Sequence, residues 1–191
     1  MVKAADLKEE LFIVLLPKKN DMRKALELQE TISKHYNLYN DDDYPELHIT
    51  LNRINKRDID EAKEVIAEVV QNYQQNPIKI EISNLKCFCL KEKFLVLKVD
   101  ETDSLTSLST QLHQQLVNRD LSTLTNYEEW SFHMSLISNI FAKNPISDQE
   151  FNKICLILDG IPQKISTVGQ SIEIWRPTLD KDKKVIASFK L

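Results

Sequence analysis

The chain has 191 residues, 42% of them hydrophobic and 28% charged, with a formal net charge of −4. This length is enough to bury a sizeable core as one domain or two small lobes, and this charge gives no bulk attraction to nucleic acids or acidic membranes. With only two glycines, Gly160 and Gly169, the sequence excludes a P-loop and a glycine-rich dinucleotide-binding turn. Any phosphate must therefore be held by side chains.

Three cysteines, an odd number, argue against a framework of disulfide bonds. We therefore predict that Cys87, Cys89 and Cys155 are reduced thiols, mostly buried. The sequence shows no signal-peptide pattern and no apolar run of membrane-spanning length, so a cytoplasmic location away from membranes is expected. No Cys/His spacing is typical of a zinc site, and the acidic run at positions 41–43 needs no metal to explain it. We expect neither a metal nor a cofactor.

Hydrophobic periodicity and helix-capping residues predict alternating strands and helices along the chain. The first half contains a strand at 11–16, a helix from Asn20 or Asp21 to about Tyr36, a strand at 46–53, a helix capped by Asp58 and ended by Pro77, and a strand at 78–90. The second half contains a strand at 94–99, a helix capped by Asp103 or Ser104, a strand at 130–140, a helix from Ser147 or Asp148 to Leu158, and a strand at 164–175. A last strand is predicted at 183–191.

Both halves thus follow the order strand, helix, strand, helix, strand, which indicates an internal duplication of the pattern. We predict an α+β protein in which residues 1–191 form a single bilobal domain. By this repeat the lobes span approximately residues 11–90 and 93–191, with a cleft between them, and an exchange of strands between the lobes is left open.

Two short segments repeat the same residue types: LHITL at positions 47–51 and FHMSL at positions 132–136. Each alternates apolar and polar residues, which is typical of a strand whose successive side chains point to opposite faces. The apolar face can bury in a core while the polar face looks into a cleft. The polar face carries one histidine and one hydroxyl in each copy: His48 with Thr50, and His133 with Ser135.

Two imidazoles at one site suit acid–base chemistry, because an unperturbed histidine has a pKa of about 6.5. A neutral ring can take a proton from an attacking water or hydroxyl, and a protonated ring can give one to the leaving alkoxide. The hydroxyls of Thr50 and Ser135 can donate to the non-bridging oxygens of a phosphodiester. One His-x-Ser/Thr motif is a weak signal, but the matched pair favours a function over a structural role. His35 and His113 are expected at the surface, outside this site.

The paired motifs resemble the signature of the two-histidine (2H) phosphoesterase superfamily, the group of LigT-like RNA 2′-5′ ligases and cyclic phosphodiesterases. Its hallmark is two His-x-Thr/Ser motifs, each followed by an apolar residue, and these stand here as HITL at positions 48–51 and HMSL at positions 133–136. The resemblance also covers the order of strands and helices from about Leu11 to Leu191. It implies a LigT-like fold, in which two pseudo-symmetric lobes of antiparallel sheet line a central cleft and the helices lie outside.

The same resemblance implies an RNA-processing enzyme, a metal-independent phosphodiesterase. It would act on 2′,3′-cyclic phosphates or 2′-5′ phosphodiester bonds of nucleotides or RNA ends, and typically open the cyclic ester to a 2′-phosphate. His48 and His133 would then be the acid–base pair, while Thr50 and Ser135 would hold the phosphate. Ser135 departs mildly from the threonine of many members but keeps the hydroxyl. We favour His133 as the base that activates water and His48 as the acid, and leave the reverse assignment open.

Four further residues are candidates for substrate binding. Trp175, Tyr44 and Phe12 offer aromatic faces on which a nucleobase could stack, with packing in the core as the alternative. Arg53 could add positive charge for a phosphate, with an ion pair at the surface as the alternative.

Other functions remain open at the level of the sequence. The same chemistry could ligate RNA ends reversibly and make the protein an RNA 2′-5′ ligase, which would have to use the energy of a cyclic phosphate end. A non-catalytic module that binds nucleotides or RNA is a second alternative, and an α+β protein with two structural histidines is a third. A nucleotide or RNA terminus is the expected binding partner, and the sequence gives no indication of a protein partner.

Overall fold

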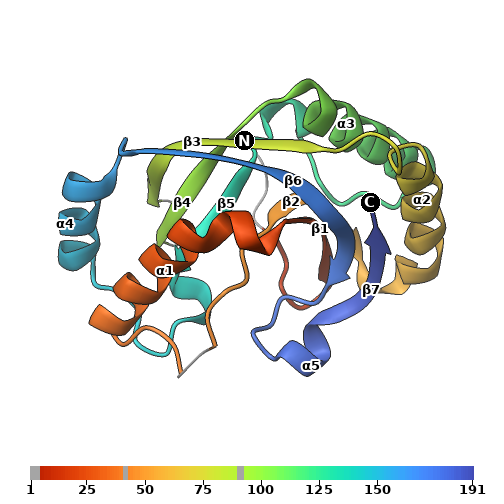
Figure 1. Ribbon diagram of the computed structural model, residues 1–191. Coiled ribbons are helices and arrows are strands. Elements are labelled where there is room, and N and C mark those ends of the chain that lie inside the picture. Colours follow the sequence, from red (N-terminus) through yellow and green to blue (C-terminus); the bar gives the residue numbers. More distant parts are fainter. Residues whose placement is uncertain (1–4, 41–42, 90–92) are drawn as a thin grey trace.

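The computed structural model describes residues 5–40, 43–89 and 93–191 as an α+β assembly (Figure 1). The strands are β1 (Glu10–Pro17), β2 (Ile49–Asn55), β3 (Lys79–Cys89), β4 (Lys93–Asp100), β5 (His133–Ser138), β6 (Pro162–Trp175) and β7 (Val185–Lys190). The α-helices are α1 (Arg23–His35), α2 (Ile59–Gln71), α3 (Asp103–Asn118), α4 (Asp148–Leu158) and α5 (Lys181–Lys184). Asp41 and Asp42 of the acidic run lie outside the described residues.

The strands pair antiparallel in one sheet with the order β2-β1-β6-β3-β4-β5, and β7 pairs with β6 beside this path. The order is symmetric about the central pair β6–β3, because β1 and β4 flank it and β2 and β5 form the two edges. The last strand of each sequence repeat is exchanged: β3 joins β4, and β6 joins β1. The predicted α+β fold with antiparallel sheets is confirmed.

The helices are exchanged between the halves as well. α1 contacts β5 and α4 contacts β3, whereas α2 and α3 contact each other and β2. In Figure 1, α1 and α4 accordingly lie toward one end of the sheet and α2 and α3 toward the other. Each of the two edge strands is thus covered by a helix from the other half of the chain, an arrangement that hydrophobic periodicity cannot reveal.

Strand alternation divides β1 between a core and a cleft. Leu11, Ile13 and Leu15 are fully buried in the core, where the apolar faces of the helices cover them. Phe12 and Leu16, at the intervening positions, line the cleft described below. Burying each large apolar side chain contributes about 1.5 to 3 kcal/mol, so the alternation fixes which face of the sheet is left for function.

Of the four helix starts at which the sequence predicted a capping residue, α4 has the predicted side-chain hydrogen bond. Helix α1 begins after Met22 rather than at Asn20 or Asp21, and Asp58 stands at the start of α2 without a capping hydrogen bond. Ser147 Oγ accepts a hydrogen bond from the amide of Glu150 at the start of α4, as predicted. At the start of α3 the cap is Thr102, whose hydroxyl accepts from the amide of Leu105, and not Asp103 or Ser104. Thr102 has the extended backbone that this position requires, whereas Asp103 already lies inside the helix.

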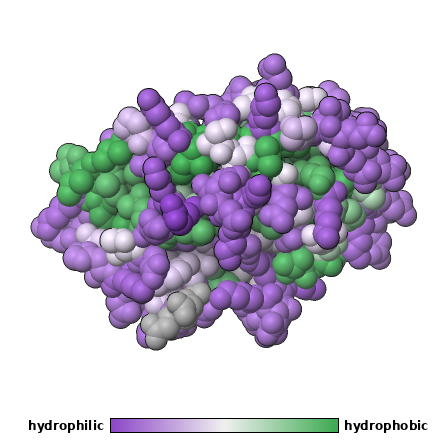
Figure 2. Space-filling view, viewed as in Figure 1, coloured by the Kyte–Doolittle hydropathy of each residue, from purple (hydrophilic) through white to green (hydrophobic). Residues whose placement is uncertain are grey.

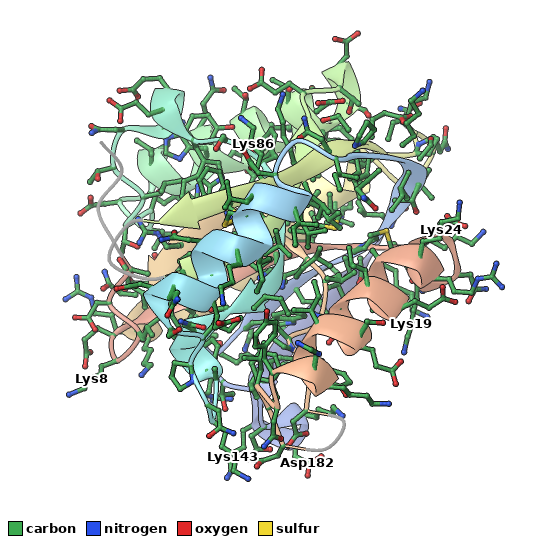
Figure 3. All side chains as sticks on the ribbon, turned by 90° about the vertical axis from the view of Figure 1, so that its left-hand side faces the viewer. Lys8, Lys19, Lys24, Lys86, Lys143 and Asp182 are labelled. Atoms are coloured by element: carbon green, nitrogen blue, oxygen red, sulfur yellow. A yellow bond between two sulfur atoms is a disulfide. The ribbon has the colours of Figure 1, made fainter. Side chains whose placement is uncertain are left out.

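A disulfide bond joins Cys87 of β3 to Cys155 of α4, with 5.9 Å between their Cα atoms. The prediction that these two cysteines are reduced is therefore wrong, and both are half-buried rather than buried. They lie 68 residues apart in the chain and meet because α4 packs on β3. In Figure 3, which looks at the molecule from the α4 end, this helix lies in front of the strands. The side chain of Cys89 lies outside the description.

The outer surface of α4 is apolar. Leu156 is 87% exposed and its neighbour Ile157 is also exposed, and Figure 2 shows a hydrophobic patch at the end of the molecule where α4 lies. Across the parts of the chain that the structure describes, no helix has the length and apolar character needed to cross a membrane.

Candidate active site

The two histidine motifs meet because the edge strands β2 and β5 contact each other, although they lie at opposite ends of the strand order. The sheet must therefore curl so that its edges approach. Trp130, just before β5, donates a hydrogen bond from Nε1 to the carbonyl oxygen of Thr50 at 3.1 Å. This closure brings His48 and His133, which are 85 positions apart in the sequence, into one region of the molecule.

Gln29 of α1 joins the two motif segments directly. Its side chain is 2% exposed, and its Nε2 donates to the carbonyl oxygens of Pro45 and Leu136, both at 2.8 Å. Pro45 leads into the first motif and Leu136 follows the hydroxyl of the second. A single amide group therefore sets the spacing between the motifs, because one buried donor group cannot satisfy both carbonyls if they move apart.

Tyr39 supplies a second cross-link. Its hydroxyl donates to the carbonyl oxygen of Ser138 at 2.9 Å and accepts from the amide of the same residue at 3.0 Å. Burial raises the pKa of Tyr39 to about 12, so the hydroxyl stays protonated and can serve in both bonds. The end of β5 is thereby fixed to the segment that precedes the first motif.

Each motif strand carries a bulge at the same place. In β2 the register moves from Thr50 opposite Val14 to Asn52 opposite Ile13, which leaves Leu51 as the extra residue. In β5 it moves from Ser135 opposite Val96 to Ile137 opposite Leu95, which leaves Leu136 as the extra residue. A bulge redirects the side chains on either side of it. In both halves the bulge directly follows the hydroxyl residue, so the alternation of cleft-facing and core-facing side chains ends there.

The two imidazoles are held in the same way. His48 Nδ1 lies 2.7 Å from the carbonyl oxygen of Glu46, and His133 Nδ1 lies 3.1 Å from the carbonyl oxygen of Ser131. A carbonyl can only accept, so Nδ1 carries the proton in both rings. Each Nε2 is then left with its lone pair when the ring is neutral and becomes a donor when the ring is protonated. Both histidines therefore have the form that a general acid or base requires.

A cleft of about 1700 Å³ contains most of the motif side chains. His48, Thr50 and Ser135 line it, together with largely apolar walls. His133 lines a second, smaller cavity of about 410 Å³, where its ring meets the edge of Phe88 with 5.9 Å between the ring centroids. The two histidines thus line different cavities, but His133 is close enough that a proton on it lowers the pKa of His48.

Burial lowers the pKa of both histidines. The pKa of His48 falls to about 4, mainly by desolvation, with the charges of His133 and Lys184 acting in the same direction. The carbonyl and carboxylate of Glu46 oppose this change. Desolvation lowers the pKa of His133 too, against its hydrogen bond to Ser131. Both rings are therefore predominantly neutral near pH 7 until an anion enters between them.

Three of the four predicted substrate-binding residues line the large cleft. Phe12 and Tyr44 are half-buried there, so part of each ring is accessible. Trp175 also lines the cleft but is only 5% exposed, and its ring packs against His48 with 4.7 Å between the centroids. Trp175 is thus a wall behind His48 and has no open face for a nucleobase.

Arg53 does not line the cleft. It is 3% exposed, and its Nη1 lies 3.2 Å from Glu10 Oε2. Its carbonyl accepts from the amide of Thr123, in the segment that covers this end of β2. The prediction of a phosphate-binding role is wrong for this residue, because the fold commits its guanidinium to a buried ion pair.

The two remaining histidines lie apart from the motifs. His35 is exposed near the end of α1, as expected. His113 is half-buried rather than exposed: its Nδ1 lies 2.9 Å from Asn52 Nδ2, and its ring stacks on Tyr127 at 4.0 Å. This contact joins α3 to β2 and gives His113 a structural role. Among the described residues, no group of three or more His, Cys, Asp or Glu is placed to hold a metal ion.

Sequence reasoning missed several residues that surround the motifs, and three of them show what signal the sequence held. Gln29 had a readable signal, because it stands on the buried face of α1 between Ala25 and Ile32, at helical spacing. Phe88 had a weaker one: it pairs with Phe94 as Trp175 pairs with Phe12, so it is the counterpart of Trp175 in the repeat. Lys184 had none, because it follows the repeated part of the chain.

The family model for the AKAP7 2′5′ RNA ligase-like domain matches residues 12–167. The chain belongs to this family. It is therefore a member of the 2H phosphoesterase superfamily, as the motifs indicated, and the known members of that superfamily are phosphoesterases and ligases. No curated protein matches the chain in sequence.

Solved structures show the same fold. E. coli LigT complexed with 3′-AMP has a TM-score of 0.64 at 9% identity, with 96% of this chain and 98% of that chain covered. The protein TT0787 of Thermus thermophilus has a TM-score of 0.64 at 11% identity, with coverages of 95% and 97%. A structure described as a phosphoesterase has a TM-score of 0.55 at 13% identity, with coverages of 96% and 98%. At these identities the likeness concerns the fold alone.

Proposed function

We propose that this protein is a phosphodiesterase that opens 2′,3′-cyclic phosphates or cleaves 2′-5′ phosphodiester bonds in nucleotides or RNA ends, with His48 and His133 as the acid–base pair. The observation that carries the proposal is the equivalence of the two motifs. Both histidines hold Nδ1 on a carbonyl two residues upstream and have a hydroxyl two residues downstream. His48 directly precedes β2, His133 begins β5, and these two edge strands contact each other. A structural role for the rings would not require this matched arrangement.

The reaction uses one water molecule and needs only proton transfers from the protein. The neutral imidazole removes a proton from water through Nε2 while the water oxygen bonds to phosphorus. The P–O3′ bond breaks, and the protonated imidazole gives its Nε2 proton to the leaving 3′ oxygen. The product is a 2′-phosphate with a free 3′-hydroxyl, and solvent restores the two protonation states. Thr50 and Ser135 donate to the non-bridging oxygens as negative charge builds on them.

The negative charge of the substrate favours the state in which one histidine is protonated and the other is neutral. Burial makes both rings poor proton acceptors, but a phosphodiester anion beside them favours one imidazolium. The cleft volume of about 1700 Å³ leaves room for a nucleotide, and Phe12 and Tyr44 are the aromatic surfaces on which its base would stack. The 3′-AMP complex of the related LigT fold supports a nucleotide as the ligand. The chemistry calls for no metal or cofactor, and we expect it to take place in the cytoplasm.

Ligation is the alternative within the same site. The family is named for its likeness to 2′5′ RNA ligases. If the 5′-hydroxyl of a second RNA end replaced water as the nucleophile, its oxygen would bond to phosphorus, the P–O3′ bond would break, and the product would be a 2′-5′ phosphodiester with a free 3′-hydroxyl. A non-catalytic module that binds nucleotides or RNA would keep the cleft and lose turnover. Intact histidines and hydroxyls in both motifs favour the enzyme.

The test is turnover of each 2′,3′-cyclic nucleotide and of a 2′-5′-linked dinucleotide in the presence of EDTA, with separation of 2′- from 3′-phosphate products. We expect hydrolysis to the 2′-phosphate, and we expect His48→Ala and His133→Ala each to lower kcat/KM by about 10³-fold. His35→Ala, at an exposed position, is the control and should keep full activity. Loss of activity in EDTA would refute the metal-free mechanism. Binding without turnover of any of these compounds would favour the binding module.

A further inference from the structure

The two halves of the site differ in the length of chain beyond the last strand of the repeat. β3, which carries Phe88, pairs antiparallel with β4, and only positions 90–92 separate the two strands in the sequence. After Trp175, in contrast, the chain continues for 16 residues, 176–191, which include α5 and β7. This segment has no counterpart in the other half, and it lies beyond the residues that the family model matches. It brings Lys184 to the His48 side alone.

Lys184 is a buried lysine, 9% exposed, at the end of α5. Its Nζ forms an ion pair with the carboxylate of Glu46 and lies 4.1 Å from the centroid of the Trp175 ring. A cation over an indole and beside a carboxylate is stabilised by both, which compensates for removing the ammonium group from water. The lysine therefore has a fixed position and is not a mobile surface charge.

Both partners of Lys184 also contact His48. The main-chain carbonyl of Glu46 accepts the Nδ1 proton of His48, and the ring of Trp175 packs on the imidazole. His48, Glu46, Lys184 and Trp175 thus form a closed ring of contacts. Trp175 is fixed in turn by its Nε1, which donates to Glu173 Oε2 at 2.6 Å. Lys184 thus contacts both groups that hold the imidazole.

His133 has no such ring of contacts among the described residues. Its ring meets the edge of Phe88. The two lysines that line its cavity, Lys86 and Lys98, are exposed, and Lys98 Nζ lies 3.7 Å from Asp100 Oδ1. The charged groups that face His48 are Glu46 on its own segment, Lys184 on α5 and His133 on β5. Glu173 on β6 is already occupied by Trp175 and Ser188.

We propose that Lys184 is a positioning residue for His48: through Glu46 and Trp175 it fixes the two groups that hold the imidazole, and its charge beside the ring disfavours protonation, so that His48 is the general base and His133 the general acid. The assignment of roles rests on the proposed function and reverses the preference drawn from the sequence. The direction follows from charge, since an ammonium group beside an imidazole disfavours a second positive charge. Lys184 accordingly lowers the pKa of His48, and no cation of the described chain acts on His133 in this way.

The test combines a titration that needs no substrate with a pH profile that does. The pKa of His48 is measured by ¹H–¹⁵N NMR, with its signal assigned through His48→Gln, in wild type and in Lys184→Met, Lys184→Arg and Glu46→Gln. Lys183→Met is the matched control, because Lys183 is adjacent but exposed and paired with Asp180. Circular dichroism establishes that each variant is folded. The profile of kcat/KM against pH is then recorded for the same set.

We expect Lys184→Met to raise the pKa of His48, because it removes the ammonium and leaves the Glu46 carboxylate unpaired. The acid limb of the pH profile should move up with it, so that kcat/KM at pH 5 falls by about threefold relative to its value at pH 7. Lys184→Arg should restore the wild-type curves. Glu46→Gln should not raise the pKa, since it removes the negative charge and keeps the lysine. Lys183→Met should behave as wild type.

A folded Lys184→Met variant with an unchanged His48 titration would overturn the inference, whatever its activity, because a merely structural lysine would lower stability without moving the titration. A shifted titration with an unmoved acid limb would overturn the assignment of His48 as base. If wild type turns over no substrate, the proposed function fails, while the titration still decides the role of Lys184 on its own.

Discussion

The His48 half and the His133 half of the site share a frame and differ in their surroundings. Both have an edge strand with a bulge after the hydroxyl residue, a carbonyl that holds Nδ1, and an aromatic side chain beside the ring. The His48 half adds a buried ion pair from α5, and the His133 half adds a disulfide bond between β3 and α4. The repeated parts place the paired histidines and hydroxyls, and the unrepeated parts give the two equivalent rings different surroundings.

The disulfide bond is the difference with the largest expected effect on stability. Closing a loop across a sequence separation of 68 residues restricts the unfolded chain, so reduction should lower the free energy of unfolding by about 3 kcal/mol. Thermal unfolding with and without dithiothreitol measures this. Cys155→Ser should unfold like the reduced wild type and should not respond to the reductant. An equal response of both proteins would show that the bond does not stabilise the His133 half.

Gln29 tests whether the halves depend on each other. Gln29→Met keeps the shape of the side chain but leaves the buried carbonyls of Pro45 and Leu136 without their donor, which should cost about 2 kcal/mol in urea unfolding. It should also lower kcat more than KM changes, because the spacing of the motifs is lost. Gln114→Met, at an exposed position of α3, is the control and should change neither. If Gln29→Met lost stability but kept full activity, the hydrogen bonds of Gln29 would stabilise the protein without setting the spacing of the motifs.

Acid stability gives the smallest expected effect. The pKa of His48 is about 4 in the folded protein against 6.5 for the free side chain, so the unfolded chain binds more protons between these values. Stability is therefore full above pH 6.5 and is lost as the pH falls toward 4, by about 2 kcal/mol from this residue at pH 5. His48→Gln should flatten the urea-unfolding curve over that window. His133→Gln, compared over the same window, shows how far the two rings differ. A slope unchanged in His48→Gln would contradict the buried, neutral ring.

The strands and long helices were predictable because each buries one face, and the period of the apolar residues reports that face directly. The histidine and hydroxyl pairs were predictable for the same reason, since alternation alone places His48 with Thr50 and His133 with Ser135. Beyond the bulges, the alternation no longer predicts which side chains face the cleft and which face the core. A bulge at Leu51 depends on pairing with β1, which the local sequence does not record.

Residues whose role depends on a distant partner could not be assigned. Arg53 could not be recognised as the partner of Glu10, nor Cys87 as the partner of Cys155, because each contact follows from how whole elements pack. Trp175 was recognised as a residue of the cleft but not as the wall between His48 and Lys184.

The sequence by itself determined the fold class, the duplication and the chemical groups of the site, because these are encoded in local periodicity and in residue type. Only the tertiary structure decided the exchange of strands and helices between the halves and the closure of the sheet that brings β2 to β5. It also decided the unequal surroundings of the two histidines. The physical reason is that pKa and orientation depend on burial and on charges brought from far along the chain, and Lys184 acts on a residue 136 positions before it.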